Sequence, residues 1–334
     1  MGLTVPGEFG GMGQGPRVAV AVLDEIGQRC ASTGMVYLMH LCGVSCYAAR
    51  PDVAADELRA AARGEHLTTL AWSEKGSRSH FWAPVSKASR SNGHVELSAE
   101  KSWVTSANHA DGYVVSTGSA SGESPMQTTL YLIKRGDGNF GASGGFEALG
   151  MRGNDSTPMS FKSVRLDSSR ELSEDGKGFD TMIGVVLPMF QLGNSAIQIG
   201  IAEAAVKSTT SHLTGKRFEH LDSKLADLPN LRARLAEMRI ETDKARAHLA
   251  ATLHAIENPG PATMLMVLES KAMASDAALK VTDLAMKACG GAAFSRHLSV
   301  ERNFRDARAA GVMAPTSDVL HDFIGRALCG MELF

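Results

Sequence analysis

Apolar residues at helical spacing dominate the first part of the chain. Across residues 18–46 they recur every three or four positions, with a break near Ser32-Thr33-Gly34, and residues 58–63 continue the pattern. Stripes of this kind are typical of amphipathic helices, whose apolar face has to be covered by another part of the fold. The sequence therefore predicts an N-terminal helical domain over residues 1–65.

The pattern changes at His66 and stays different to about Leu166. Short runs rich in β-branched and aromatic residues alternate with turn signals such as Ser91-Asn92-Gly93, and several of them have a period of two. This pattern favours an antiparallel β-barrel or sandwich, which we assign to residues 66–172. The predicted strands are residues 66–73, 94–97, 102–106, 112–116, 128–133 and 159–164.

The helical period returns after the polar turn from Ser173 to Gly178. Four long amphipathic or largely apolar segments follow, and together they predict a C-terminal four-helix bundle over residues 173–334. The predicted helices are residues 179–213, 231–256, 261–289 and 318–328. The fold class is therefore α+β, with a helical domain, an antiparallel β domain and a helical bundle in that order.

Composition and charge exclude several kinds of protein. The formal net charge of the 334 residues is −2, which gives no electrostatic case for binding nucleic acid or an anionic membrane. No stretch resembles a signal peptide, and no window reaches ~18 uninterrupted apolar residues, so we expect a cytoplasmic protein without a membrane span. Cys42 and Cys46 lie four residues apart, but no second pair completes a metal site, and we interpret them as buried small residues.

Several short motifs, together with this domain order, resemble the acyl-CoA dehydrogenase family over nearly the whole chain. The most specific is Val300-Glu301-Arg302-Asn303-Phe304-Arg305-Asp306-Ala307-Arg308, which follows the pair Gly290-Gly291. Compared with the family, the N-terminal helical domain is short. The other motifs are Leu3-Thr4-Val5-Pro6-Gly7-Glu8-Phe9-Gly10-Gly11-Met12-Gly13, Trp72-Ser73-Glu74-Lys75-Gly76-Ser77-Arg78-Ser79, Lys101-Ser102-Trp103-Val104-Thr105-Ser106, Ala148-Leu149-Gly150-Met151-Arg152-Gly153 and Lys216-Arg217-Phe218.

The resemblance implies an FAD-dependent oxidoreductase that acts on the CH–CH group of an acyl thioester, with FAD at the junction of the β domain and the bundle. Trp103 would then be the platform for the isoalloxazine ring, with hydroxyls of Ser73 and Thr105 toward its edge. Ordinary strand residues are the alternative interpretation of Trp103 and Thr105. The other residues assigned to the cofactor are Ser79, Arg217, Phe218, Lys287, Gly290, Gly291, Thr316 and Asp318, and those assigned to the substrate are Ser79, His80 and Met189.

Two of these cofactor residues have plain structural alternatives. Gly290 can be a glycine C-cap, and Arg217 can be a solvated surface arginine. In the family, the Arg217-Phe218 element contacts the flavin of a neighbouring subunit, so the resemblance implies a homotetramer or homodimer. The Glu301-Arg302 and Arg305-Asp306 pairs are expected to form ion pairs that hold the end of the bundle.

The catalytic base of the family is absent from its two known positions. The usual glutamate aligns with Ala314, and the alternative position on the first bundle helix aligns with Met189. Asp318 lies one helical turn past Ala314 and is a weak candidate for the base, although N-capping of a helix is its other interpretation. The catalytic residues therefore stay unassigned.

Two other functions fit the same fold. A flavin-dependent monooxygenase, with FMN or FAD supplied in reduced form by a flavin reductase, needs no such base but tends to use histidines, for which His40, His80 and His321 are the candidates. A flavin-binding protein without dehydrogenase activity is the third interpretation. For the dehydrogenase, the expected partners are an acyl thioester or other small organic substrate and an electron-acceptor flavoprotein.

Overall fold

The computed structural model describes residues 1–78 and 80–333 of the chain. Two compact units can be separated, and each consists of segments from distant parts of the sequence. The first unit comprises Met1–Ala19, Met35–Glu147 and Arg152–Phe190, and the second comprises Val20–Gly34, Ala148–Met151 and Gln191–Phe334. The three domains predicted from the sequence stay a proposal.

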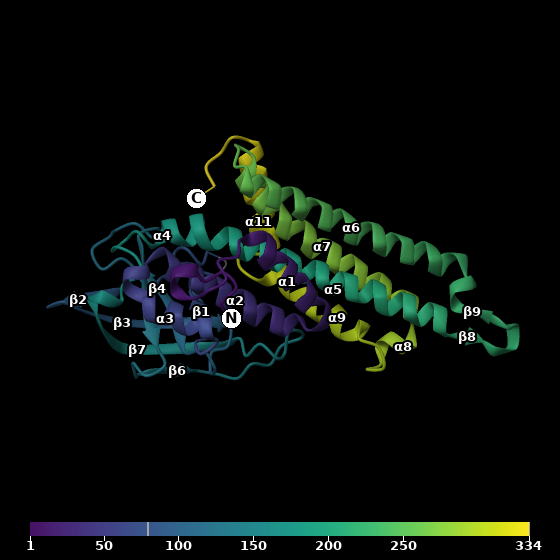
Figure 1. Cartoon of the computed structure of the whole chain (residues 1–334), viewed down its shortest axis with the longest axis horizontal. Helices are drawn as coiled ribbons and strands as arrows, with labels where there is room; N and C mark the ends of the chain where they lie inside the picture. Colours follow the sequence, from purple (N-terminus) through teal and green to yellow (C-terminus); the bar gives the residue numbers. More distant parts are fainter. Residues whose placement is uncertain (79, 334) are drawn as a thin grey trace. The chain divides into compact units, whose positions relative to one another are not determined.

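The first unit contains the predicted β domain (Figure 1). One sheet has the order β1-β4-β5 and the other the order β2-β3-β7-β6, and residues of both sheets share one apolar core. The paired strands are antiparallel except that β1 pairs with β4 in parallel, which differs from the purely antiparallel domain expected. The strands are β1 (Thr68–Ala71), β2 (Ala88–Ser91), β3 (His94–Val104), β4 (Gly112–Gly118), β5 (Thr128–Lys134), β6 (Phe140–Ala142) and β7 (Thr157–Asp167).

Strand β3 is the main departure from the predicted strands. The sequence predicts two strands, over residues 94–97 and 102–106, but residues 94–104 form a single strand, and Thr105 and Ser106 lie beyond its end. Register shifts against β7 occur between Leu97 and Ala99 and between Lys101 and Val104. The alternation of buried and exposed residues is regular from Val95 to Lys101, and only the second shift changes it.

Ahead of the sheets, the predicted N-terminal helices are α1 (Pro16–Arg29), α2 (Ala31–Ala49) and α3 (Pro51–Arg63). Residues 20–34 group with the second unit because α1 packs closely on α5 (Leu187–Gly215). A Cβ atom on Gly27 would lie 2.9 Å from the carbonyl oxygen of Ile197, and one on Gly200 would lie 2.5 Å from that of Asp24. Glycine at both positions therefore allows the two helix backbones to approach each other.

The second unit contains the long helices of the predicted bundle, which run alongside one another (Figure 1). These are α5, α6 (Pro229–Glu257) and α7 (Thr263–Cys289), whose apolar residues pack together around Met238 and Val281. The fourth predicted helix, α11 (Ser317–Leu328), is shorter and contacts α7. The segment before α5 is irregular, with α4 (Gly178–Thr181) and a π-helical turn, η3 (Met182–Val186). Short helices α8 (Gly291–Phe294), α9 (Val300–Asp306) and α10 (Arg308–Val312) were not predicted, nor was the hairpin of β8 (Arg217–Phe218) and β9 (Ser223–Lys224).

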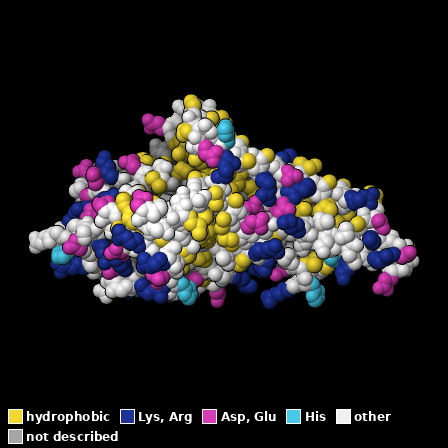
Figure 2. Space-filling model, in the orientation of Figure 1, with side chains coloured by type: hydrophobic (Ala, Val, Ile, Leu, Met, Phe, Trp, Pro, Cys, Tyr) yellow, Lys and Arg dark blue, Asp and Glu magenta, His cyan; other side chains and the backbone are white. Residues whose placement is uncertain are grey.

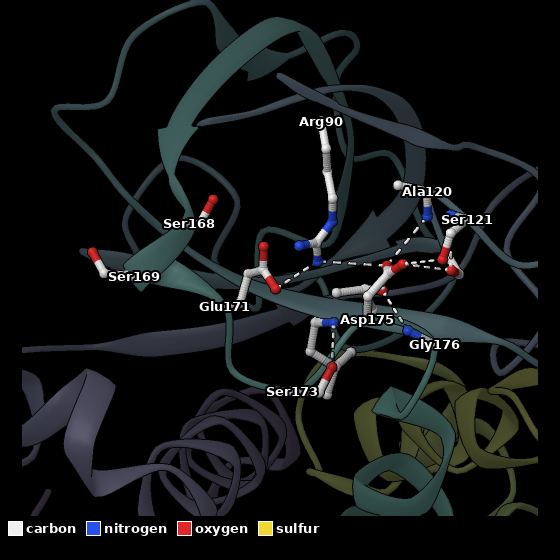
Figure 3. Close-up of polar contacts among 12 residues, drawn as sticks. Arg90, Ala120, Ser121, Ser168, Ser169, Glu171, Ser173, Asp175 and Gly176 are labelled. Atoms are coloured by element: carbon white, nitrogen blue, oxygen red, sulfur yellow. Dashed lines mark hydrogen bonds and ion pairs between the residues drawn. The ribbon is translucent and has the colours of Figure 1, made fainter. Parts of the chain in front are cut away.

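The turn that leads into α4 is fastened to the sheet by one carboxylate (Figure 3). Asp175 accepts hydrogen bonds from the hydroxyls of Ser119 and Ser121 at 2.8 Å and of Thr129 at 2.7 Å. Arg90 lies 3.6 Å from the same carboxylate. Although burial acts to raise it, these hydrogen bonds lower the pKa of Asp175 to about 2.

Length and composition alone would allow the helical stretch Gly178–Gly215 to cross a membrane. Its most apolar window is 67% buried within the chain, and the core helix of a soluble protein has the same properties. On the face shown in Figure 2, acidic and basic side chains are interspersed, in agreement with the near-neutral net charge.

Candidate functional site

Trp103 is the most exposed aromatic residue that the sequence assigned to a site. Along β3 the side chains of Val95, Leu97, Ala99 and Lys101 face the buried side, so the period of two would bury Trp103 as well. The register shift between Lys101 and Val104 reverses this alternation, and Trp103 takes a positive φ of 60°. Its side chain is consequently 65% exposed, which leaves a flat apolar surface for another molecule to cover.

A buried ion pair includes Lys101, two residues before this tryptophan on β3, and no function was assigned to the pair from the sequence. The Lys101 ammonium donates to the Glu74 carboxylate at 2.6 Å and to the carbonyl oxygens of Ser116 at 2.5 Å and Trp72 at 3.3 Å. The second carboxylate oxygen of Glu74 accepts from the backbone N–H of Val85 at 2.7 Å. The pair therefore joins the loop that follows β1 to the end of β3.

Burial and charge pairing act in opposite directions on these two groups. Burial lowers the pKa of Lys101 to about 8, against the opposing effect of the Glu74 carboxylate. Burial acts to raise the pKa of Glu74, but the charge and hydrogen bond of Lys101 hold it below its usual value. Both groups are thus held as an ion pair at neutral pH, and each compensates the buried charge of the other. A lysine at an apolar position of the β3 pattern was the signal that could have revealed the pair.

Ser73 lies beside Trp103 through the backbone, because its carbonyl oxygen accepts from Ser102 N–H at 2.9 Å. Thr105 is buried, and its hydroxyl is 2.9 Å from that of Ser156, so it is already engaged within the β domain. His80 is exposed, and its ring contacts the Trp82 ring edge-on, with 5.1 Å between the ring centroids. Among the remaining predicted residues of this unit, Met189 is half-buried and Ser79 lies outside the described residues.

The segment around Ala314 is held by a buried lysine in the second unit. Lys271, on α7, donates to the carbonyl oxygens of Met313 at 2.9 Å and Pro315 at 2.6 Å. Its side chain is fully buried, and burial lowers the pKa of Lys271 to about 7. The two carbonyl acceptors stabilise the charged form and so oppose this shift. Lys271 therefore fixes the backbone on both sides of Ala314.

Thr316 and Asp318 lie at the start of α11, directly after this segment. Thr316 is the N-cap residue, with φ −66° and ψ 163°, and Asp318 lies in the first turn of the helix with an exposed side chain. The N-capping role that was the alternative for Asp318 is therefore wrong, because Thr316 occupies the N-cap position, although a carboxylate in the first turn is still favourable to the helix dipole. Its role as a base stays a proposal.

Gly290 and Gly291 separate α7 from α8. Gly290 has φ 56° and ψ −135°, a backbone conformation that is strained for any residue with an L side chain. Among the described residues, nothing lies within 4 Å of a Cβ built on Gly290 or Gly291. The backbone at this helix end is therefore open to close approach by another molecule.

The three other predicted cofactor residues of this unit have partners in the chain. Lys287, in the last turn of α7, pairs with Asp283 at 2.6 Å. Arg217 pairs with Asp222 across the β8–β9 hairpin. Phe218, on β8 of the same hairpin, contacts the His220 ring edge-on, with 6.1 Å between the ring centroids.

The motifs at residues 148–153 and 300–308 come together within the second unit. Asp306 accepts a hydrogen bond from Met151 N–H at 2.6 Å, and a Cβ on Gly150 would lie 2.4 Å from the carbonyl oxygen of Arg305. Arg305 pairs with Glu301 at 2.8 Å, one helical turn earlier. The expected Arg305–Asp306 ion pair is therefore wrong, because neighbouring side chains on a helix point in different directions.

His40 is a core histidine and not a site residue. Its Nδ1 accepts from Thr68 N–H at 3.3 Å, so the ring proton resides on Nε2, which donates to the carbonyl oxygen of Met1 at 3.1 Å. Burial lowers the pKa of His40 to about 4, and the ring is neutral at physiological pH. Both nitrogens are engaged, which leaves His80 and His321 as the monooxygenase candidates.

Family models and curated relatives both match this chain to acyl-CoA dehydrogenases. Residues 69–164 match the family model for the acyl-CoA dehydrogenase middle domain, and residues 176–329 match that for the C-terminal domain. The cyclohex-1-ene-1-carbonyl-CoA dehydrogenase of Syntrophus aciditrophicus is 28% identical over 97% of this chain and 78% of its own length.

The fold is shared with solved structures of other proteins. Butyryl-CoA dehydrogenase from Megasphaera elsdenii superposes with a TM-score of 0.91 at 21% identity, covering 98% of this chain and 86% of that one. The structure of PigA with FAD and proline gives a TM-score of 0.90 at 16% identity, with the same coverage. At such identities the likeness concerns the fold.

Proposed function

Because the chain belongs to the acyl-CoA dehydrogenase family, we propose that it is an FAD-dependent oxidoreductase acting on the CH–CH group of an acyl thioester. Members of the family are flavin-dependent oxidoreductases. The observation that supports a flavin site most strongly is the exposed ring of Trp103, turned outward by the bulge in β3.

The residues of the chain fit FAD at several points. Trp103 offers a flat apolar platform, Ser73 adjoins it, and Gly290 and Gly291 leave a helix end open to a nucleotide. Lys101 and Glu74 would position the strand that carries Trp103. When bound, FAD would accept the hydride that leaves the β carbon of the acyl group.

The proton on the α carbon needs an acceptor that the chain must supply. Ala314 and Met189 cannot fill this role, and Asp318 is the acidic residue near Ala314 along the sequence. We assign Asp318 as the candidate base, with Lys271 as a positioning residue for the segment that precedes it. Thr316 lies between this segment and Asp318 and would contact the flavin.

The missing glutamate also favours a second function, a flavin-binding protein without dehydrogenase activity. The monooxygenase alternative, with FMN or FAD and a flavin reductase, has lost one of its histidine candidates, because both nitrogens of His40 are hydrogen-bonded in the core. As partners we propose an electron-acceptor flavoprotein and further copies of the chain in a homotetramer or homodimer, in the cytoplasm.

An anaerobic titration of the FAD-loaded protein with a panel of acyl-CoA thioesters tests the proposal. Bleaching of the visible flavin band, lost in Asp318→Asn but retained in the matched variant Asp322→Asn, supports a dehydrogenase with a displaced base. Oxygen consumption that requires an added flavin reductase would instead support the monooxygenase. If no thioester and no reductase changes the flavin, the non-catalytic alternative is correct.

A further inference from the structure

A row of buried polar side chains follows one face of α5. Gln191, Asn194 and Gln198 are fully buried, and their spacing of three and four residues places them on the same side of the helix. Among the described residues, no hydrogen-bond partner is present for either amide atom of Gln191 and Gln198, or for the amide oxygen of Asn194. In folded proteins most buried polar groups are paired, because an unpaired one costs about 1–3 kcal/mol.

The beginning of this row lies next to the Ala314 segment. The Asn194 amide nitrogen is 3.5 Å from the sulfur of Met313, and Gln191 is one helical turn earlier. The hydroxyl oxygens of Ser195 and Ser270 lie 3.3 Å apart, which places this face of α5 against α7, where Lys271 follows. The unpaired amides of Gln191 and Asn194 are therefore close to the position of the family's base.

We infer that Gln191 and Asn194 form a polar acyl-binding subsite, so that the favoured substrate carries a neutral hydrogen-bonding group on its acyl chain, such as a hydroxyl or a carboxamide. This inference rests on the proposed function, since it assigns Ala314 to the acyl end of the site. A primary amide offers two donors and one acceptor, which suits a group that both donates and accepts.

A charged acyl group fits these residues less well. The two amides carry no charge, and the neighbouring cation, Lys271, already donates to the carbonyl oxygens of Met313 and Pro315. A plain alkyl chain fits worst, because it leaves both buried amides without a hydrogen-bond partner. A site built to hydrogen-bond its substrate rejects the analogue that lacks the polar group.

The experiment compares CoA thioesters in pairs of equal acyl length, one unsubstituted and one bearing a hydroxyl or carboxamide. Binding to the FAD-loaded protein is followed through the flavin spectrum and by calorimetry. We expect the polar member to bind about ten- to a hundred-fold more tightly than its unsubstituted partner. Gln191→Leu and Asn194→Leu should each reduce this ratio, because leucine is of similar size and cannot pair.

Gln198→Leu is the matched control. It removes an equally buried amide from the same face, seven residues and about 10 Å along the helix from Gln191, and should leave the ratio unchanged. Equal or tighter binding of unsubstituted thioesters overturns the inference, while the proposed function stands. An unchanged ratio in Gln191→Leu and Asn194→Leu also overturns the inference, because it would mean that internal water satisfies the amides. If FAD binds but no thioester does, the proposed function fails and the subsite with it.

Discussion

Replacing Lys271 with methionine tests how the Ala314 segment is held. Lys271 is fully buried, and burial lowers its pKa from an ordinary value of about 10.4 to about 7. Methionine has a similar unbranched shape and no charge. It also leaves the carbonyl oxygens of Met313 and Pro315 without their donor, which costs roughly 1–3 kcal/mol each.

The charge makes this comparison depend on pH. Below pH ~7 the lysine is protonated in both states, so the native state bears the full cost of the buried charge, roughly 4–5 kcal/mol. Between pH ~7 and ~10 the unfolded state binds more protons than the native state, and stability rises with pH. From pH 7 to 9.5 the wild type should gain about 3 kcal/mol relative to Lys271→Met.

Urea unfolding at several pH values, followed by circular dichroism, measures the free energy of unfolding of both proteins. Lys280→Met is a matched control, because Lys280 is exposed and pairs with Glu237 on the same helix bundle. The difference in free energy of unfolding between the wild type and Lys280→Met should not rise by about 3 kcal/mol between pH 7 and 9.5. Parallel curves for the wild type and Lys271→Met would refute the reasoning, since they would mean that the ammonium keeps its ordinary pKa in the fold.

Three further substitutions have expected effects on stability. Glu74→Gln leaves the Lys101 charge buried without a counter-ion and should lower the free energy of unfolding by roughly 3–5 kcal/mol; a loss below ~1 kcal/mol in urea unfolding would contradict this. For Asp175→Asn we expect a loss of about 2 kcal/mol at neutral pH that shrinks as the pH falls from 4 to 2, because the carboxylate pKa of about 2 lies below its unfolded value; a loss that persists at pH 2 would show another cause. Gly150→Ala places a Cβ 2.4 Å from the Arg305 carbonyl oxygen and should cost about 1–3 kcal/mol, visible as a lower melting temperature; an unchanged temperature would mean that the backbone adjusts.

Much of the fold was predictable from hydrophobic periodicity. The long helices α5, α6 and α7 and the strands β4 and β5 carry strong patterns, and they occur close to the predicted positions. Strands β2 and β6 were missed because they are short and largely exposed. The short helices α9 and α10 were recognised only as a family motif, since seven and five residues are too few for a clear period.

The candidate site was predictable only where a local motif carried it. The sequence drew attention to Trp103, but not to the bulge that exposes its ring, because a bulge depends on pairing with a distant strand. Lys101 and Glu74 stood in quoted motifs without a role, since a sequence separation of 27 positions hides their contact. Lys271, Gln191 and Asn194 carried no sequence signal beyond polar residues in apolar helices, and only packing shows which of them lack partners.

The visible absorption spectrum of the FAD-supplemented protein tests the central claim most directly. The account predicts a bound flavin band in the wild type after excess cofactor is removed, and loss of most of it in Trp103→Ala, because the exposed ring is the platform. The control is Phe294→Ala, which removes another exposed aromatic ring and should retain the flavin band. Trp82→Ala would not serve as a control, because Trp82 is buried. A wild-type protein that stays colourless after FAD is supplied would contradict the assignment as a flavoprotein oxidoreductase.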